Sequence, residues 1–340
     1  MIKHIHTLII NKVGKNSRKY IYDFGSTKNV ELILSETGIS ITAQLTKVYD
    51  KEEMLSGDSY LFPDAIKKAL LLYLLKYNKA LNINSITAKI DDEQEEIPFP
   101  KGAKPPIYSM INGNLHRKVP KAFSNDTVFD YLLKTPKSKY DKRIASLFAL
   151  LCSKGKEYET ERFIYLWTSF NGMYGWISEL IAEANGVERY RKEYVQILGF
   201  QQFIGVGKGT IAEKDRSPIA NSVISVLKEI PADNVSRSNI ETKEISKRIE
   251  GVLSKDSSNK YNLTAYGYVL TQLAYYFRCK IVHGSKPVYL FSYGDDKELH
   301  SLKIINALLE EFIDNNLPLW FDDNYINDII IPKTDKIKLK

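Results

Sequence analysis

Short apolar runs separated by turn residues dominate the first third of the chain, a pattern typical of β-strands. Gly25 and Gly38 fall between such runs and are expected in turns. A longer segment, 64–77, is strongly apolar on one side and follows Pro63, which suits the first turn of a helix. The pattern predicts an α+β domain over residues 1–115, in which one helix covers antiparallel strands. The expected strands occupy residues 5–11, 20–24, 30–34, 39–48 and 83–90.

A polar stretch rich in proline follows this domain. Residues 91–94 are acidic and polar, and the sequence PFPKGAKPP at 98–106 is incompatible with regular secondary structure. We therefore expect a linker within residues 92–122.

From residue 123 the apolar positions recur every three or four residues, which is the spacing of amphipathic helices. The clearest stripe belongs to a helix that begins near residue 157, and Gly172 and Gly175 beside it indicate the close approach of another helix. The pattern predicts a mainly α-helical domain over residues 123–322 and a basic tail at 323–340. The stripe consists of Phe163, Trp167, Phe170, Tyr174, Ile177 and Ile181. Other expected helices occupy residues 126–133, 140–153, 218–230, 240–253, 264–283 and 298–316.

Composition narrows the classes of function. A length of 340 residues fits two domains, and a net charge of +7 favours an anionic partner, with nucleic acid as the first candidate. Lysine-rich usage can also reflect a biased genome, so charge alone decides little. The two cysteines, Cys152 and Cys279, form no CxxC pair, which suits a reducing cytosol. The start of the chain has no signal-peptide pattern, and the most apolar run, 69–75, is too short to span a bilayer. A cytoplasmic protein without membrane insertion is expected.

Several familiar catalytic motifs do not match this sequence. The segment from Gly205 to Thr210 lacks the glycine and hydroxyl spacing of a phosphate-binding P-loop, and no GxSxG motif occurs. Four histidines, His4, His6, His116 and His300, show no metal-ligand spacing with cysteines or acids. We expect neither a cofactor nor a bound metal.

The candidate chemistry lies at the end of the helix expected at 264–283, where Arg278 precedes His283 by five residues. Arginine holds phosphate with fixed donors and stays charged, whereas histidine moves protons near neutral pH. Cleavage of RNA needs both, because a base must deprotonate the ribose 2′-hydroxyl and a cation must stabilise the phosphorane-like transition state. The pair alone is a weak motif. Its simpler interpretation is a surface arginine and a histidine that favours the helix dipole.

Two separated segments resemble the HEPN superfamily of ribonucleases. Arg278, His283 and Gly284 match the family's pattern of arginine, four to six residues, then histidine and usually glycine, late in a helix. The aromatic-rich segment 162–174 resembles the first core helix of the Apea-like HEPN branch. The resemblance covers about 157–320. It departs from the family at Cys279, where a polar residue, typically asparagine, is usual and helps to position the substrate.

The resemblance implies a helical bundle that pairs as a homodimer and cleaves RNA without metal, leaving a 2′,3′-cyclic phosphate and a 5′-hydroxyl. Many such proteins are toxins or anti-phage effectors. Arg278 and His283 would be the catalytic residues, with Cys279 at a supporting position. A separate geometric argument favours a dimer, because residues five apart on a helix point about 140° away from each other. Two protomers could bring four side chains to one cleft.

Other residues are candidates for the same site. Asn171 could hold Arg278 or a phosphate, or form an interhelical hydrogen bond. Glu161 could orient Arg278, or simply favour the helix dipole. Lys280 and Lys286 could bind the RNA backbone, or be solvated.

The sequence leaves rival functions open. A non-catalytic module binding RNA or a nucleotide, and an interaction or scaffold subunit, are the alternatives to the ribonuclease. The N-terminal domain would sense a trigger, select the RNA or restrain the nuclease, through a regulatory partner or alone, and nothing in the sequence chooses among these roles.

Overall fold

The structure, a computed structural model, describes residues 2–24, 27–50, 53–55, 61–97, 126–134, 141–204, 274–282 and 296–339, and single residues at 123 and 271. The chain forms two compact units, Met1–Asp141 and Lys142–Lys340, and each is described by itself. The helices expected at 218–230 and 240–253 lie outside the described residues, as does most of the first half of the helix expected at 264–283.

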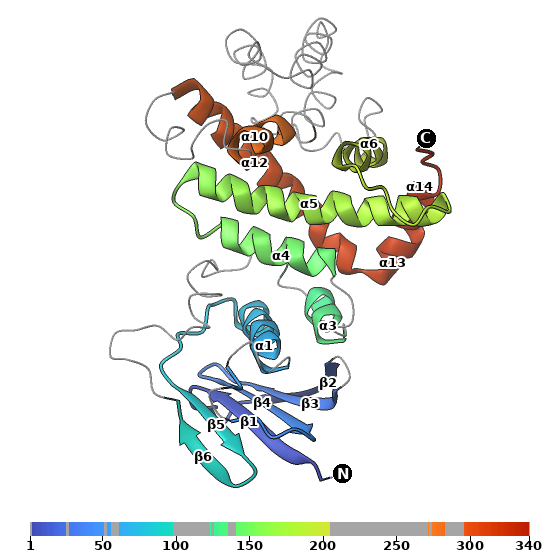
Figure 1. The fold of residues 1–340 in the computed structure, drawn as a ribbon. Helices are drawn as coiled ribbons and strands as arrows, with labels where there is room; N and C mark the ends of the chain where they lie inside the picture. Colours follow the sequence, from blue (N-terminus) through green and yellow to red (C-terminus); the bar gives the residue numbers. More distant parts are fainter. Residues whose placement is uncertain are drawn as a thin grey trace, which may run out of the picture. The chain divides into compact units, whose positions relative to one another are not determined.

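The N-terminal unit is built on a six-stranded sheet in the order β2-β3-β4-β1-β5-β6 (Figure 1). Every neighbouring pair of strands is antiparallel. The strands are β1 (His4–Ile10), β2 (Arg18–Phe24), β3 (Thr27–Leu34), β4 (Ile39–Leu45), β5 (Ile86–Ile90) and β6 (Glu93–Glu96). The α+β architecture expected from the sequence is confirmed, with β6 as an additional strand inside the expected linker.

One face of the sheet is buried beneath helix α1 (Phe62–Tyr77). Alternate residues of the strands point towards this core because side chains alternate across a strand. Leu8, Leu32 and Ile41 are fully buried there, as are Ile66 and Leu72 of α1. The arrangement agrees with the prediction of antiparallel strands covered by one helix.

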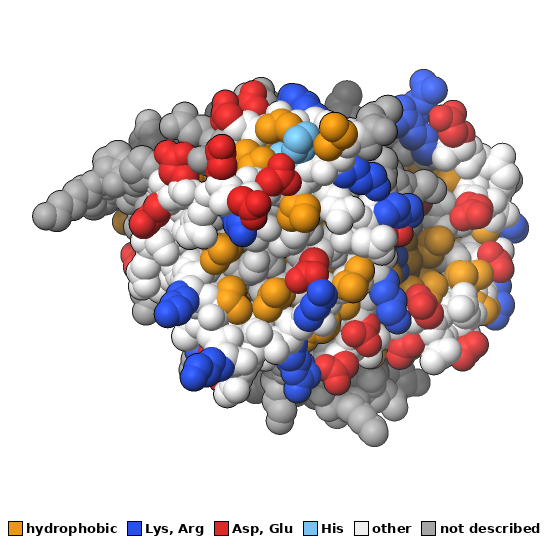
Figure 2. All heavy atoms as spheres, turned by 90° about the horizontal axis from the view of Figure 1, so that it is seen from below, with side chains coloured by type: hydrophobic (Ala, Val, Ile, Leu, Met, Phe, Trp, Pro, Cys, Tyr) orange, Lys and Arg blue, Asp and Glu red, His pale blue; other side chains and the backbone are white. Residues whose placement is uncertain are grey.

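The opposite face of the sheet carries a mixture of side chains. Lys19 pairs with Glu31 across β2 and β3, and the hydroxyls of Thr7 and Thr42 lie 3.0 Å apart across β1 and β4. The view in Figure 2 shows basic, acidic and apolar side chains interspersed on one face of the molecule.

Helix α3 (Asp126–Lys134) belongs to the N-terminal unit, although we expected residue 123 to begin the helical domain. Its Phe129 ring lies 5.3 Å from the ring of Tyr20 on β2, and the Lys68 ammonium of α1 donates a hydrogen bond to the carbonyl of Leu133 at 3.1 Å. These contacts come from tertiary packing that the sequence pattern alone does not reveal. The boundary between the units therefore lies at Asp141 and Lys142.

The C-terminal unit is mainly helical. Its longer helices are α4 (Lys142–Ser153), α5 (Glu159–Ala184), α6 (Glu193–Ile204), α10 (Ala274–Val282) and α12 (Asp296–Asn316). Every residue of the predicted aromatic and aliphatic stripe of α5 is buried. The apolar face predicted for the last long helix is buried as well and consists of Leu302, Ile305, Leu308, Leu309 and Phe312.

The two glycines of α5 lie where another helix approaches closely, as the sequence predicts. A Cβ atom added to Gly172 would lie 2.1 Å from Oγ of Ser146 and 2.7 Å from the carbonyl oxygen of Lys142, both on α4. At Gly175 the nearest atom would be Nζ of Lys142, at 3.0 Å. Gly172 therefore permits the packing of α4 on α5.

The segment after residue 322, which we predicted to be a basic tail, is folded into short helical turns. A 3₁₀ turn, η3 (Leu317–Phe321), is followed by α13 (Asp323–Tyr325), a π-helical turn η4 (Ile326–Ile330) and α14 (Ile331–Thr334). Ile330, Thr334 and Ile337 are buried, and the amide of Asn185 donates to the carbonyl of Ile337 at 2.9 Å. Apolar residues at helical spacing outweigh the basic composition of this segment.

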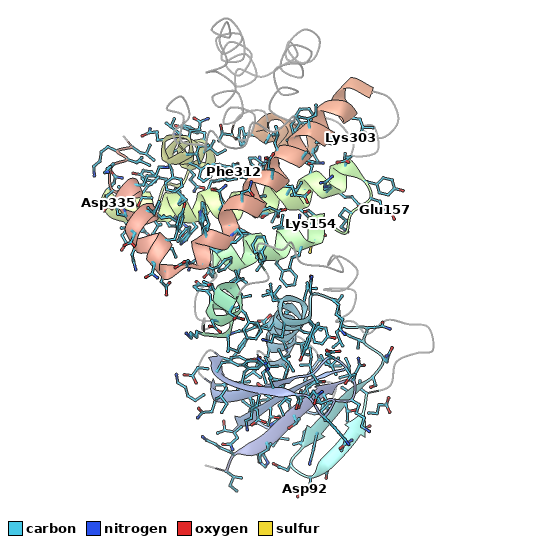
Figure 3. All side chains as sticks on the ribbon, turned by 180° about the vertical axis from the view of Figure 1, so that it is seen from behind. Asp92, Lys154, Glu157, Lys303, Phe312 and Asp335 are labelled. Carbon is cyan, nitrogen blue, oxygen red and sulfur yellow. The ribbon has the colours of Figure 1, made fainter. Side chains whose placement is uncertain are left out.

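A network of charged residues ties α4, α5 and α12 together. Lys154, which is labelled in Figure 3, follows directly after α4. It pairs with Glu310 and, at 2.8 Å, with Asp314, both on α12. Arg162 of α5 pairs with the same Glu310. Burial raises the pKa of Glu310, but hydrogen bonds from Lys154 and Arg162 outweigh this effect and lower it overall. The shared carboxylate fixes the crossing of three helices.

Candidate active site around Arg278

Helix α10 carries Arg278 and packs against α5. Ala274, Phe277 and Ile281 are buried at spacings of three and four residues, so one face of α10 points into the core. Arg278 follows Phe277 directly, and its side chain is 21% exposed. The guanidinium therefore lies at the edge of the core, where it can meet both buried groups and solvent.

The acid beside Arg278 is Glu193, the first residue of α6. Nη2 of Arg278 lies 3.4 Å from Oε2 of Glu193, whose side chain is 25% exposed. The hydroxyl of Tyr174, on α5, donates to the other carboxylate oxygen at 2.7 Å. A tyrosine, a glutamate and an arginine from three helices thus form one continuous polar chain.

Tyr174 is suited to be a permanent donor in this chain. Burial, with the hydrogen bond to Glu193, raises the pKa of its hydroxyl. The hydroxyl therefore stays protonated at any physiological pH and anchors the Glu193 carboxylate. A carboxylate anchored on one oxygen can hold a guanidinium in a fixed direction with the other.

One ring of an aromatic cluster lies beside the arginine. The guanidinium carbon lies 5.9 Å from the centroid of the Tyr275 ring, which is 6.2 Å from Trp167. Trp167 is in turn 5.9 Å from Tyr174. The charge of Arg278 therefore lies next to weakly polar rings, where it is screened less than it would be in water.

The other predicted site residues are placed differently. Asn171 is exposed on α5. Glu161 is also exposed, and its carboxylate lies 4.0 Å from Nζ of Lys156. Among the described residues the acid that pairs with Arg278 is Glu193, whereas Glu161 lies beside Lys156. The reason is that α5 turns Glu161 away from the core, whereas the first turn of α6 faces Arg278.

The histidine of the motif lies outside the described residues. His283 and Gly284 follow directly after the end of α10 at Val282, and Lys286 lies in the same segment. Cys279 and Lys280 belong to α10, but their side chains are not among those described. The structure therefore brings Arg278 together with Glu193, Tyr174 and Tyr275, and it does not test the positions of the remaining candidates.

Sequence reasoning missed Glu193 because it did not identify α6. A signal exists, since Ile197, Phe200 and Phe203 recur every three residues after the charged stretch and are buried. The pairing with Arg278 depends on how α6 returns across α5, which spacing along the chain does not encode.

In the part of the chain that the structure describes, no group of three or more histidine, cysteine, aspartate or glutamate side chains could hold a metal ion. Within the same residues, no helix has the length and apolar character needed to cross a bilayer. Comparisons of this chain with protein-family models, curated proteins and solved structures gave no match.

Proposed function

We propose that this protein is a metal-independent endoribonuclease of the HEPN type, acting as a homodimer and as a toxin or anti-phage effector. The observation that supports the proposal most is the environment of Arg278. This arginine sits at the edge of an aromatic core, held by Glu193, four residues before the end of α10 and five before His283. The likeness of the α5 and α10 segments to HEPN ribonucleases adds a second line of support.

In the proposed reaction His283 removes the proton from the ribose 2′-hydroxyl. The resulting oxygen attacks the adjacent phosphorus, and the bond from phosphorus to the 5′-oxygen breaks. The leaving oxygen takes a proton from a histidine, which in a dimer would be the second copy of His283. The products are a 2′,3′-cyclic phosphate and a 5′-hydroxyl, and no electrons are exchanged.

Arg278 would stabilise the extra negative charge on the phosphorane-like transition state. A guanidinium carries five N–H donors in a planar fork whose geometry matches the oxygens of a phosphate. Glu193 would act as a positioning residue, because it limits the directions that the flexible arginine side chain can take. Such a restriction reduces the entropy lost when substrate binds.

The experiment that tests this proposal incubates the full-length protein with total RNA and with tRNA in EDTA. Cleavage by the wild type, loss of cleavage in Arg278→Ala and His283→Ala, and cyclic-phosphate ends are the expected results. Arg18→Ala is the matched control, because Arg18 is an exposed arginine on β2 of the N-terminal unit. Equal cleavage by all four proteins would contradict the assignment of both residues.

The homodimer has its own test. Sedimentation at the concentrations used for cleavage should show a dimer, and activity should fall on dilution below the dissociation constant. A fully active monomer would contradict a site composed from two protomers.

A binding-only module is the second candidate, because exposed cations lie close to Glu193 in sequence. In that case the protein would bind RNA and His283→Ala would change neither binding nor function. Cleavage that depends on His283 would exclude it.

A further inference from the structure

Three cations precede α6 directly. Arg189, Arg191 and Lys192 are all exposed, and among the residues that the structure describes no carboxylate lies within 4.0 Å of their charged nitrogens. Tyr190 and Tyr194 interleave with them in the sequence. We call residues 189–194 the basic aromatic segment.

The position of these cations is electrostatically unfavourable by itself. The N-terminus of a helix carries a partial positive charge, so cations there are repelled and anions are attracted. The acid in the first turn of α6 is Glu193, and its carboxylate is already engaged by Arg278 and by the hydroxyl of Tyr174. The segment therefore has a positive potential that a bound polyanion would relieve.

The aromatic residues make a nucleic-acid strand the best-fitting polyanion. Tyr194 is 58% exposed, and Nζ of Lys192 lies 5.8 Å from the centroid of its ring. Exposed rings beside cations are the combination by which proteins hold single strands, since the ring stacks on a base and the cations contact phosphates. An acidic peptide would use the cations but not the ring.

The segment is physically continuous with the proposed active site. Glu193 lies within it, and the same side chain contacts Arg278 at 3.4 Å. A strand bound along residues 189–194 would therefore run next to Arg278. We infer that the basic aromatic segment is the docking surface for single-stranded RNA beside the Arg278 site, with Tyr194 stacking on a base. This inference rests on the proposed ribonuclease function and names the residues that hold its substrate.

The test measures binding separately from cleavage. Full-length His283→Ala protein, which would not cleave, is titrated into a fluorescein-labelled single-stranded RNA in EDTA at several salt concentrations. Replacing Arg189, Arg191 and Lys192 by glutamine should weaken binding by about tenfold or more and reduce the slope of log affinity against log salt by about 2. An affinity and a salt slope that do not change on this replacement would overturn the inference. The inference would also fail if the His283→Ala protein with residues 189–194 intact did not bind RNA.

The matched control replaces Lys12, Lys15 and Arg18 by glutamine. These are exposed cations of the N-terminal unit, and their replacement changes the net charge by the same amount. An equal loss of affinity in this variant would show a general charge effect and overturn the inference. If circular dichroism shows that the segment variant is unfolded, the three single glutamine variants replace it, each with an expected reduction in slope of about 0.7.

Stacking by Tyr194 has a separate readout. Tyr194→Ala should weaken binding at least fivefold with little change in the salt slope, whereas Tyr194→Phe should bind like the wild type. A polyglutamate peptide should compete poorly with RNA. Equal competition, together with no effect of Tyr194→Ala, would identify an acidic protein partner and overturn the inference.

The two proposals can fail independently. RNA binding that depends on residues 189–194, without cleavage of any RNA in EDTA, would contradict the ribonuclease and leave the docking surface. Cleavage that depends on His283 with no contribution from residues 189–194 would contradict only the docking surface.

Discussion

Lys68 offers a quantitative test of how the N-terminal unit is packed. It lies on α1, its ammonium donates to the carbonyl of Leu133 at 3.1 Å, and Nζ lies 4.4 Å from the centroid of the Tyr22 ring. Burial lowers the pKa of Lys68 from 10.5 to about 8. The neutral form is therefore favoured in the folded state more than in the unfolded state.

The sign of the pH dependence follows from this shift. Between about pH 8 and 10.5 the unfolded state binds more protons than the folded state, so the stability contributed by this residue rises with pH. Below about pH 8 the full cost of burying the ammonium is present, about 3 kcal/mol for a shift of this size. As pH approaches 10.5 that cost disappears.

Lys68→Met removes the titrating group while keeping a long apolar side chain. The variant should gain stability relative to the wild type at pH 7, and the difference should shrink by about 2 to 3 kcal/mol between pH 7 and pH 10. Urea unfolding followed by far-ultraviolet circular dichroism measures it. The three tryptophans, Trp167, Trp176 and Trp320, all lie in the C-terminal unit, so their fluorescence separates the two transitions.

Lys67→Met is the matched control on the same helix, because Lys67 pairs with Asp64 and is more than a third exposed. Its stability difference from the wild type should change little over this pH range. A Lys68→Met difference that stays constant to within about 0.5 kcal/mol would show that burial does not lower the pKa of Lys68 in this way, because so large a shift must appear as pH dependence.

Three further perturbations probe other parts of the structure. Tyr174→Phe should destabilise the C-terminal unit by about 1 to 3 kcal/mol, because it removes a hydrogen-bond donor to the Glu193 carboxylate. Tryptophan fluorescence in urea measures this loss of stability. The same variant should lower RNA cleavage. Tyr190→Phe is its control for stability, because the Tyr190 hydroxyl has no hydrogen-bond partner among the described residues. An equal loss of stability in both variants would contradict a role for the Glu193 contact. Burial lowers the pKa of His6, so the stability that depends on neutral His6 is fully present above pH 6.5 and falls as the pH decreases below it. His6→Gln should abolish this acid sensitivity of the N-terminal unit in urea unfolding. Acid sensitivity that persists in the variant would come from another group. Gly172→Ala should destabilise the C-terminal unit by about 1 to 3 kcal/mol and more than Gly175→Ala. The added Cβ at Gly172 would meet the backbone of α4, whereas the one at Gly175 would meet the end of a flexible lysine. Thermal unfolding that ranks the two variants in the reverse order would contradict the close packing of α4 on Gly172.

The sequence was informative wherever local pattern and burial coincide. Short apolar runs between turn residues located the strands whose buried face packs on α1, and helical spacing located the α5 stripe and the apolar face of α12. Gly172 marked a close helix approach because only a residue without Cβ fits there. These features are encoded within a few residues of one another.

Features set by tertiary packing were harder to predict. Composition suggested a basic tail after 322, whereas Ile330 and Ile337 anchor that segment in the C-terminal unit. The pairing of Arg278 with Glu193 joins residues far apart in the chain, so Glu161, which is nearer the α5 motif, was the more obvious candidate. Arg278 itself could be proposed from sequence because its chemistry and spacing are local.

The proposed ribonuclease activity is best measured as the rate at which the full-length protein cleaves a defined single-stranded RNA in EDTA, beside His283→Ala. We expect cleavage by the wild type that leaves a 2′,3′-cyclic phosphate, and a loss of several hundredfold or more in the variant. Cleavage at the same rate by both proteins, or products ending in a 3′-hydroxyl, would contradict it.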